Sequence, residues 1–223
     1  MKPILAFDVY GTLVDPMGMA DLLAPDAGQA AESVSAQWRE KQLEFSFRKG
    51  LMRMYEDFGA CTRQALRYAM ASHGLSLSGE REDELMGAYL SLPAFDDSLP
   101  ALESLKGEYR MFAFSNGTYP ALEKVLGHNH LLDLFEGLVS VDDIKSFKPD
   151  PAVYAYARRA TGAMDKSLCL VSSNAWDVIG ARAAGLTAIW VQRDAGKVFE
   201  DWGIEPNAVV RSLSELPATL DNL

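Results

Sequence analysis

The sequence predicts an α/β protein in which a parallel sheet carries helices on both faces. Three observations predict this: short apolar runs recur along the chain, helical patterns separate them, and one long stretch shows helical spacing only. Uninterrupted apolar runs are typical of strands buried on both faces, as in parallel sheets. We therefore expect a core formed by residues 1–15 and 94–223. The intervening residues 16–93 are expected to form a helical insert that acts as a lid.

The first strand is expected at Ile4-Leu5-Ala6-Phe7, which lies between a proline and an aspartate. Later strands are expected at residues 110–114, 137–140, 168–171, 187–191 and 208–210. Helices are expected from about residue 121, over residues 151–160 and up to residue 184, since proline is tolerated in a first helical turn. Within the insert, the helices are expected to break near Gly50, Gly59 and His73-Gly74.

Composition and charge exclude several classes of partner. The 223 residues include 21 Lys and Arg but 31 Asp and Glu, which gives a net charge of −10. A negative field repels nucleic-acid phosphates and anionic lipid, so we expect neither nucleic acid nor a membrane as partner. The chain shows no secretory signal and no run of about 18 apolar residues. Its two cysteines are too few for a disulfide framework, so we expect a cytoplasmic protein.

Polar side chains follow several of the expected strands. Asp8 and Thr12 follow the first strand, and Ser115 and Asn116 follow the second. The strand at residues 168–171 is followed by Ser172, Ser173, Asn174 and Asp177, and Lys148 precedes a helix. Ligands of open α/β sheets bind beyond the carboxyl ends of the strands. The sequence therefore predicts one polar site, built from four distant segments, at this edge.

Four segments resemble, in order, the motifs of the haloacid dehalogenase superfamily. They are Phe-Asp-Val-Tyr-Gly-Thr-Leu at 7–13, Phe-Ser-Asn-Gly at 114–117, Phe-Lys-Pro-Asp at 147–150 and Ser-Ser-Asn-Ala-Trp-Asp at 172–177. The last motif, and Trp-Arg-Glu-Lys-Gln-Leu-Glu at 38–44, are most similar to the L-2-haloacid dehalogenase (type II) branch. The resemblance implies a Rossmann-like core with an inserted cap. It also implies metal-independent hydrolysis of short L-2-haloalkanoic acids to D-2-hydroxyalkanoic acids, without a cofactor, and a homodimer.

The resemblance makes Asp8 the nucleophile, Lys148 the group that keeps it ionised, and Arg39 the acceptor of the departing halide ion. A free aspartate titrates near pH 4, and its attack on carbon would give an ester, which divides one difficult displacement into two steps. Arginine stays protonated and offers several donors to an anion. Position 40 departs from the family because Glu40 stands where relatives carry Gln. We expect Glu40 to point away from the halide or to change substrate preference.

The remaining site residues also follow from the resemblance. Thr12 is expected to order the loop after Asp8, and Asn174 and Asp177 to hold Lys148 and place the hydrolytic water. Substrate binding is assigned to Ser115, Asn116, Tyr154 and Ser172, and the apolar wall to Tyr10, Leu43, Phe58 and Trp176. Ordinary packing is the alternative interpretation of Leu43, Phe58 and Tyr154.

Two alternative functions stay open at this point. A Mg²⁺-dependent phosphatase of the same superfamily would carry a second aspartate at position 10 and an acidic ligand at position 173. This chain has Tyr10 and Ser173 there, and Mg²⁺ prefers carboxylate ligands. A non-catalytic binding protein would have lost the nucleophile or the lysine, whereas Asp8 and Lys148 are both present.

Overall fold

A parallel sheet forms the centre of the larger part of the molecule. The computed structural model of the chain describes residues 2–163 and 168–223. Within these residues the sheet has six strands in the order β3-β2-β1-β4-β5-β6, and every neighbouring pair is parallel. The strands are β1 (Ile4–Phe7), β2 (Met111–Ser115), β3 (Gly137–Ser140), β4 (Leu168–Ser172), β5 (Thr187–Val191) and β6 (Ala208–Val210).

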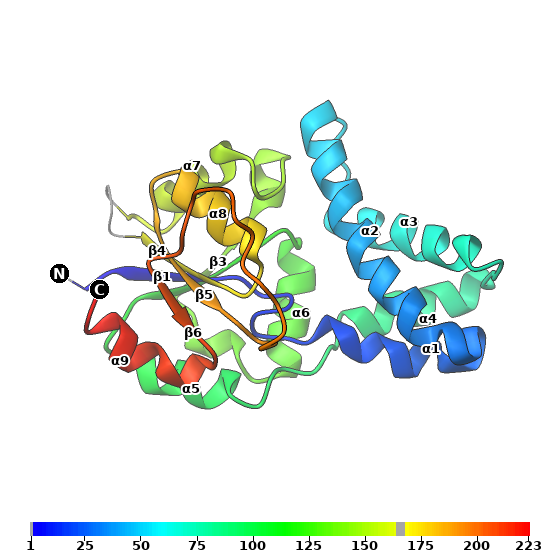
Figure 1. Cartoon of the computed structure of the whole chain (residues 1–223), viewed down its shortest axis with the longest axis horizontal. Coiled ribbons are helices and arrows are strands. Elements are labelled where there is room, and N and C mark those ends of the chain that lie inside the picture. The colour runs from blue at the N-terminus through cyan, green and yellow to red at the C-terminus, as the bar shows by residue number, and fades with distance from the viewer. Residues whose placement is uncertain (1, 164–167) are drawn as a thin grey trace.

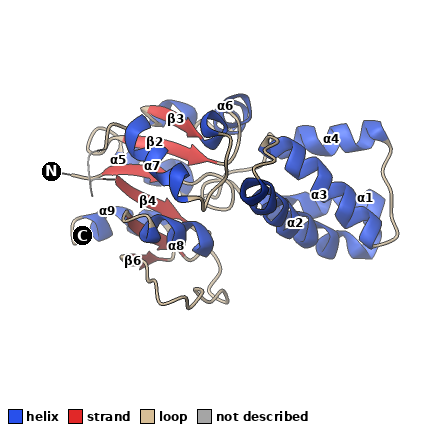
Figure 2. Cartoon of the chain, turned by 90° about the horizontal axis from the view of Figure 1, so that it is seen from above, coloured by secondary structure: helices blue, strands red, loops and turns tan. Residues whose placement is uncertain are grey.

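The central strands are buried because helices cover both faces of the sheet. Every residue of β1, β2 and β4 is buried, which explains their uninterrupted apolar runs. Helices α7 and α8 lie on one face, and α5, α6 and α9 on the other (Figures 1 and 2). Their bounds are α5 (Ser98–Leu105), α6 (Tyr119–His128), α7 (Pro151–Ala160), α8 (Ala175–Ala183) and α9 (Leu216–Leu220). The predicted α/β fold is confirmed, and each predicted strand agrees to within one residue at either end.

Four helices follow β1 and form a separate bundle beside the sheet (Figure 1). They are α1 (Met19–Ala27), α2 (Ala31–Met52), α3 (Phe58–Ser72) and α4 (Gly79–Tyr89). Trp38, Leu66 and Leu85 lie on α2, α3 and α4 respectively, and all are buried in the hydrophobic core. The helical character expected of residues 16–93 is therefore present in the structure.

The breaks expected near Gly50 and near Gly59 are a single break, because α2 ends at Met52 and α3 begins at Phe58. Gly50 lies inside α2, and Gly59 lies in the first turn of α3. The break falls between them, where Arg53 adopts a left-handed backbone (φ 55°) and ends α2. Asp57 then starts α3, because its Oδ1 accepts a hydrogen bond from the Ala60 amide at 2.8 Å. The third expected break, at His73-Gly74, is confirmed as the end of α3.

The chain enters and leaves the helical bundle through two adjacent segments. The Asp15 amide donates to the Pro93 carbonyl at 2.9 Å, and the Phe95 amide donates to the Leu13 carbonyl at 3.0 Å. Val14 and Ala94 form an isolated antiparallel bridge between these segments. The bundle is thus joined to the sheet by two paired segments that leave from the edge where β1 ends.

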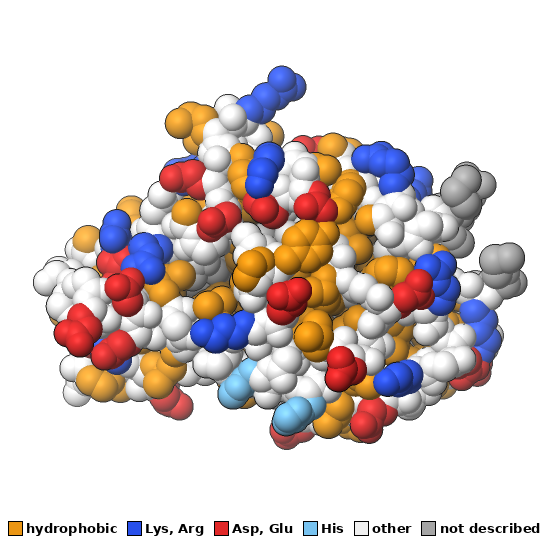
Figure 3. All heavy atoms as spheres, turned by 180° about the vertical axis from the view of Figure 1, so that it is seen from behind, with side chains coloured by type: hydrophobic (Ala, Val, Ile, Leu, Met, Phe, Trp, Pro, Cys, Tyr) orange, Lys and Arg blue, Asp and Glu red, His pale blue; other side chains and the backbone are white. Residues whose placement is uncertain are grey.

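The surface of the molecule mixes both signs of charge. On the face drawn in Figure 3, hydrophobic side chains gather toward the middle, and acidic and basic side chains are interspersed around them. No helix in the described ranges is long and apolar enough to cross a membrane.

Candidate active site

Asp8 lies directly after β1, and its carboxylate is held by one donor from the same loop and by donors from two distant segments of the chain. Thr12 Oγ1 donates to Asp8 Oδ2 at 2.9 Å, and Asn174 Nδ2 donates to the same oxygen at 2.8 Å. Lys148 Nζ donates to Asp8 Oδ1 at 3.1 Å. Only 5% of Asp8 is exposed. The carboxylate is therefore fixed in orientation, with one oxygen accepting two hydrogen bonds and the other accepting one.

Lys148 is fully buried and lies between two carboxylates. Its ammonium contacts Asp8 and also donates to Asp177 Oδ2 at 2.8 Å and to the Phe114 carbonyl at 2.9 Å. These three acceptors use all three protons of the ammonium group. Burial by itself would lower the pKa of Lys148, but the charges of Asp177 and Asp8 outweigh that effect and raise it. Lys148 is therefore a cation at neutral pH.

Asp177 faces Lys148 from the first turn of α8. Tyr154, on α7, donates its hydroxyl hydrogen to Asp177 Oδ1 at 2.8 Å, so a different donor holds each carboxylate oxygen. Complete burial raises the pKa of the Asp177 carboxyl, and the adjacent Lys148 charge opposes that rise. Burial and the Asp177 charge also raise the pKa of Tyr154, which keeps its phenol protonated. A carboxylate with a raised pKa is a better proton acceptor than an ordinary aspartate.

Ser115, Asn116 and Ser172 shape the turns at the ends of β2 and β4. Ser115 Oγ accepts from the Gly117 amide at 3.1 Å, which leaves its hydroxyl hydrogen for another acceptor. Asn116 Oδ1 accepts from the Lys148 backbone amide at 3.0 Å. This bond uses the oxygen of the side-chain amide and leaves its NH₂ group as a donor. Ser172 Oγ accepts from the Asn174 amide at 3.2 Å. Ser115 and Asn116 therefore have donor groups that suit an anionic ligand.

Arg39 reaches this edge of the sheet from α2. Its Nη2 donates to the Tyr10 carbonyl at 3.3 Å, two residues after Asp8. Asn174 Nδ2 donates to the same carbonyl at 3.1 Å. Arg39 is half-buried, whereas Glu40 is exposed to solvent. Of the two expectations for Glu40, the structure agrees with the one in which its carboxylate points away.

The aromatic residues assigned to an apolar wall occupy the boundary between the bundle and the sheet. The rings of Tyr10 and Phe58 are 6.1 Å apart, and Tyr10 stacks on Tyr89 of α4 at 5.5 Å. Trp176 packs edge-on against Phe47 of α2, at 5.0 Å. Leu43 is half-buried one helical turn after Arg39, on the same face of α2.

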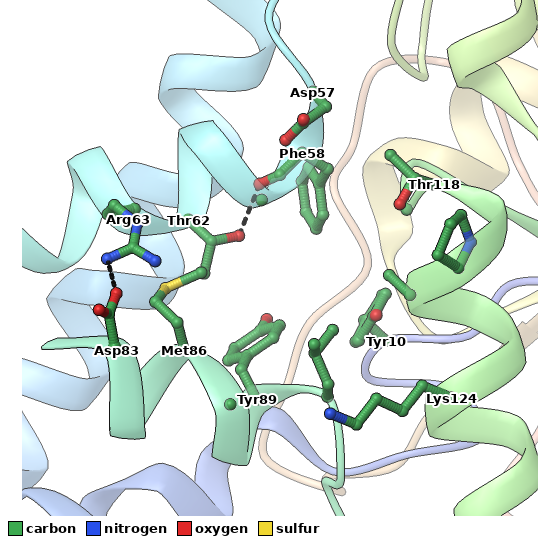
Figure 4. A pocket seen from close by; sticks show the side chains of 16 residues that line it. Tyr10, Asp57, Phe58, Thr62, Arg63, Asp83, Met86, Tyr89, Thr118 and Lys124 are labelled. Atoms are coloured by element: carbon green, nitrogen blue, oxygen red, sulfur yellow. Dashed lines mark hydrogen bonds and ion pairs between the residues drawn. The ribbon is translucent and has the colours of Figure 1, made fainter. Parts of the chain in front are cut away.

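A cavity of about 490 Å³ opens between α3 and α4 on one side and α6 on the other (Figure 4). Tyr10, Phe58, Met86 and Tyr89 contribute apolar surface to it. Asp8 and Lys148 do not line this cavity. Tyr10 lines the cavity and its carbonyl accepts from Asn174, which also holds Asp8, so the cavity adjoins the carboxylate cluster rather than containing it.

The residues present do not favour a divalent cation. In residues 2–163 and 168–223, no group of three or more His, Cys, Asp and Glu could hold a metal ion. Tyr10 stands where a further carboxylate would be needed, and its ring is packed against Phe58 and Tyr89. Ser173 uses its hydroxyl on the Gly11 carbonyl. The carboxylates of Asp8 and Asp177 share the ammonium of Lys148.

Residues that no sequence motif indicated hold the loop after Asp8 in place without contacting Asp8 themselves. Arg193 donates through Nε and Nη2 to the Thr12 carbonyl, at 3.2 and 2.6 Å, and so holds the loop after Asp8. Asp97 in turn accepts from Arg193 Nη1 and from Ser212. These residues match no motif and lie far apart in the sequence, so local patterns gave no signal for them.

Comparison with known proteins agrees with this geometry. A sequence model described as haloacid dehalogenase-like hydrolase matches residues 3–185. Two curated relatives are named (S)-2-haloacid dehalogenase. The protein from Pseudomonas fluorescens is 36% identical and aligns over 97% of this chain and 95% of its own. The protein from Pseudomonas sp. strain YL is 38% identical over 94% of this chain and 90% of its own.

Solved structures give the same result. The L-2-haloacid dehalogenase from Xanthobacter autotrophicus, with chloropropionic acid covalently bound, superposes with a TM-score of 0.93 at 29% identity, over the whole of both chains. A dehalogenase with an intermediate complex superposes with a TM-score of 0.92 at 35% identity, covering 98% of this chain and 96% of its own. The fold and site define a hydrolase with a Rossmann-like parallel sheet and an aspartate-lysine centre. This chain belongs to the haloacid dehalogenase-like hydrolase family.

Proposed function

We propose that this protein hydrolyses short L-2-haloalkanoic acids to D-2-hydroxyalkanoic acids and halide ions, through an ester on Asp8. The observation that carries the proposal is the carboxylate of Asp8, held by Thr12, Asn174 and Lys148 beside a half-buried arginine. The curated relatives at 36% and 38% identity, both named (S)-2-haloacid dehalogenase, support the same activity.

The first step is a displacement at C2 of the substrate. Asp8 Oδ1, which accepts only the Lys148 hydrogen bond, attacks C2 from the side opposite the halogen. The new C–O bond forms as the C–halogen bond breaks, and the halide leaves with the bonding electron pair toward Arg39. A halide ion needs no proton, so position 10 requires no acid, and Tyr10 serves as wall. Ser115 and Asn116 donate hydrogen bonds to the substrate carboxylate.

The second step is hydrolysis of the ester. Water attacks the carbonyl carbon of the Asp8 ester, so the bond between that carbon and the alkoxide oxygen breaks and C2 is not attacked again. C2 is therefore inverted once overall. Asp177, beside Lys148, accepts the proton of the water and returns it to the departing alkoxide oxygen, which becomes the product hydroxyl. Asp8 is restored as a carboxylate when its carboxyl proton passes to solvent, and Asn174 orients the carbonyl that is attacked. The three linked residues thus act without a metal ion or another cofactor: Asp8 is the nucleophile, Lys148 the cation and Asp177 the base.

Release of halide ions tests the proposal. Purified protein is assayed with L- and D-2-chloropropionate in the presence of EDTA. We expect chloride release from the L form only, and loss of at least about a thousandfold in the Asp8→Asn variant, because the amide is a poor nucleophile. No release from either form by a folded protein, or release only after Mg²⁺ is added, would contradict the proposal. Turnover of phosphate esters with Mg²⁺ would then favour the phosphatase.

The proposal also covers the domain arrangement, the cellular location and the oligomeric state. Residues 16–93 act as a cap over the core formed by residues 1–15 and 94–223, which is supported by the paired connecting segments. A cytoplasmic location is supported by Cys61 and Cys169, which are free and buried, as suits a reducing compartment. A homodimer is supported by Leu51, Met52 and Met54, which are exposed apolar side chains around the end of α2.

A further inference from the structure

A group of hydrogen-bonded, buried polar side chains in the helical bundle contacts Arg39. Gln42 lies three residues after Arg39 on α2 and is fully buried. Its Oε1 accepts hydrogen bonds from Arg39 Nη1 at 2.6 Å and from the Tyr89 hydroxyl at 3.0 Å. Its Nε2 donates to Thr62 Oγ1 at 2.5 Å. A buried amide is costly unless its donors and acceptors are paired, and here α3 and α4 supply the partners.

The orientation of the Gln42 amide is set by Thr62. The Thr62 hydroxyl donates its single hydrogen to the Phe58 carbonyl at 2.7 Å, so its oxygen can only accept from Gln42. Trp38 Nε1 also donates to the Thr62 carbonyl at 2.8 Å, which fixes the two helices against each other. Gln42 therefore turns its NH₂ group toward Thr62 and its oxygen toward Arg39.

The Arg39 guanidinium is consequently held at two points. Gln42 binds Nη1 inside the bundle, and the Tyr10 carbonyl binds Nη2 in the loop after Asp8. An arginine side chain without such contacts samples many rotamers. Here it bridges the bundle and the sheet at the site where the halide is to leave.

We propose that Gln42, oriented by Thr62 and Tyr89, is a positioning residue that aims the Arg39 guanidinium at the departing halide. This inference rests on the proposed function, because it presumes that Arg39 is the halide acceptor. A shift of about 1 Å in a group that stabilises a transition state can cost about a hundredfold in rate. The effect should be larger for chloride than for bromide, since chloride is the poorer leaving group and depends more on stabilisation.

The test compares Gln42→Met, which keeps the shape but has no oxygen acceptor, with Gln42→Glu, which keeps one. Ser46→Ala is the matched control, because Ser46 is buried one turn further along α2 and bonds only the Leu43 carbonyl. Single-turnover rates of halide release are measured with L-2-chloropropionate and L-2-bromopropionate, together with KM and the thermal unfolding midpoint.

We expect Gln42→Met to lower the chloride rate at least about tenfold and the bromide rate clearly less, with KM within about threefold of wild type. Gln42→Glu keeps an oxygen for Arg39 Nη1 but has no donor for Thr62 and carries a charge, so it should lose less of the chloride rate than Gln42→Met without recovering it fully. Ser46→Ala should leave the ratio of the two rates unchanged. Equal losses for both halides in Gln42→Met, or the same change of ratio in Ser46→Ala, would overturn the inference. If Gln42→Met does not fold, Thr62→Val against Thr62→Ser repeats the test.

A separate readout distinguishes failure of this inference from failure of the proposed function. A wild-type protein that releases no halide contradicts the function itself. A crystal structure of Gln42→Met still tests the positioning role, because we expect Arg39 Nη2 to leave the Tyr10 carbonyl. An unmoved Arg39 guanidinium in that structure would overturn the inference whatever the activity.

Discussion

At the scale of single residues, the site depends on one buried cation shared by two buried carboxylates. Removing any member leaves a buried charged group without its partner, so their effects cannot be added independently. The sequence motifs predicted Asp8, Lys148 and Asp177 as a group, because each lies beside the end of a strand or the start of a helix. They could not predict Gln42 or Arg193, whose roles depend on side chains that meet only after folding.

The shared charges predict a pH dependence of activity in which both the acid limit and the alkaline limit are displaced to higher pH. The pKa of Asp177 is raised, so its carboxylate is lost, as pH falls, at a higher pH than for an ordinary aspartate near 3.9. The pKa of Lys148 is also raised, so its charge persists until the pH exceeds the usual value of about 10.4.

We therefore expect kcat for L-2-chloropropionate to fall on the acid side above pH 4 and to stay level up to about pH 10. The same shift of Lys148 stabilises the fold fully below its unfolded-state pKa, and that contribution is lost as pH rises through the folded-state value. Thermal unfolding at each pH separates the two effects. An alkaline loss of activity centred below pH 9, in protein that is still folded, would contradict the assignment of Lys148.

At the scale of secondary structure, strands were predictable and helix ends less so. The central strands β1, β2 and β4 are buried on both faces, so their apolar runs are uninterrupted, and polar residues mark their limits. The glycines indicated the region of each helix end but not the terminal residue, because a glycine inside a helix costs only about 1 kcal/mol relative to alanine. The break between α2 and α3 is instead set by the Asp57 cap and by the left-handed conformation of Arg53.

Gly180 shows how tightly the elements around the site are packed. A Cβ atom at this position on α8 would lie 2.5 Å from Tyr154 Oη and 2.6 Å from Pro149 Cβ, next to Lys148. We expect Gly180→Ala to destabilise the fold by about 1–3 kcal/mol and to lower kcat, because Tyr154 or the Lys148 loop must move. Chemical unfolding and halide release measure the two effects.

Gly127→Ala is the matched control for this substitution. Gly127 also lies inside a helix, α6, but its Cβ would have no heavy atom within 4 Å. There the alanine should raise stability by up to about 1 kcal/mol and leave activity unchanged. Equal effects at the two positions would show that close packing around Tyr154 is not what requires a glycine at position 180.

At the scale of the whole molecule, an acidic protein has to bind an anionic substrate. The net charge of −10 repels a haloacid at long range. Two cations, Arg39 and Lys148, lie near the loop after Asp8, where they can oppose this repulsion locally. Lys148 is neutralised by its carboxylate partners, which leaves Arg39 as the main attraction for an anion. The position of the bundle relative to the sheet therefore decides whether the site is complete.

The central claim is that the hydroxyl oxygen of the product comes from Asp8 and not directly from water. A single turnover in H₂¹⁸O, with enzyme in excess over L-2-chloropropionate, tests this by mass spectrometry of the product and of the peptide that contains Asp8. We expect unlabelled D-lactate and one ¹⁸O atom in the Asp8 carboxylate, because water attacks the ester at the aspartyl carbon. Label in the lactate of that first turnover, with none in Asp8, would contradict it.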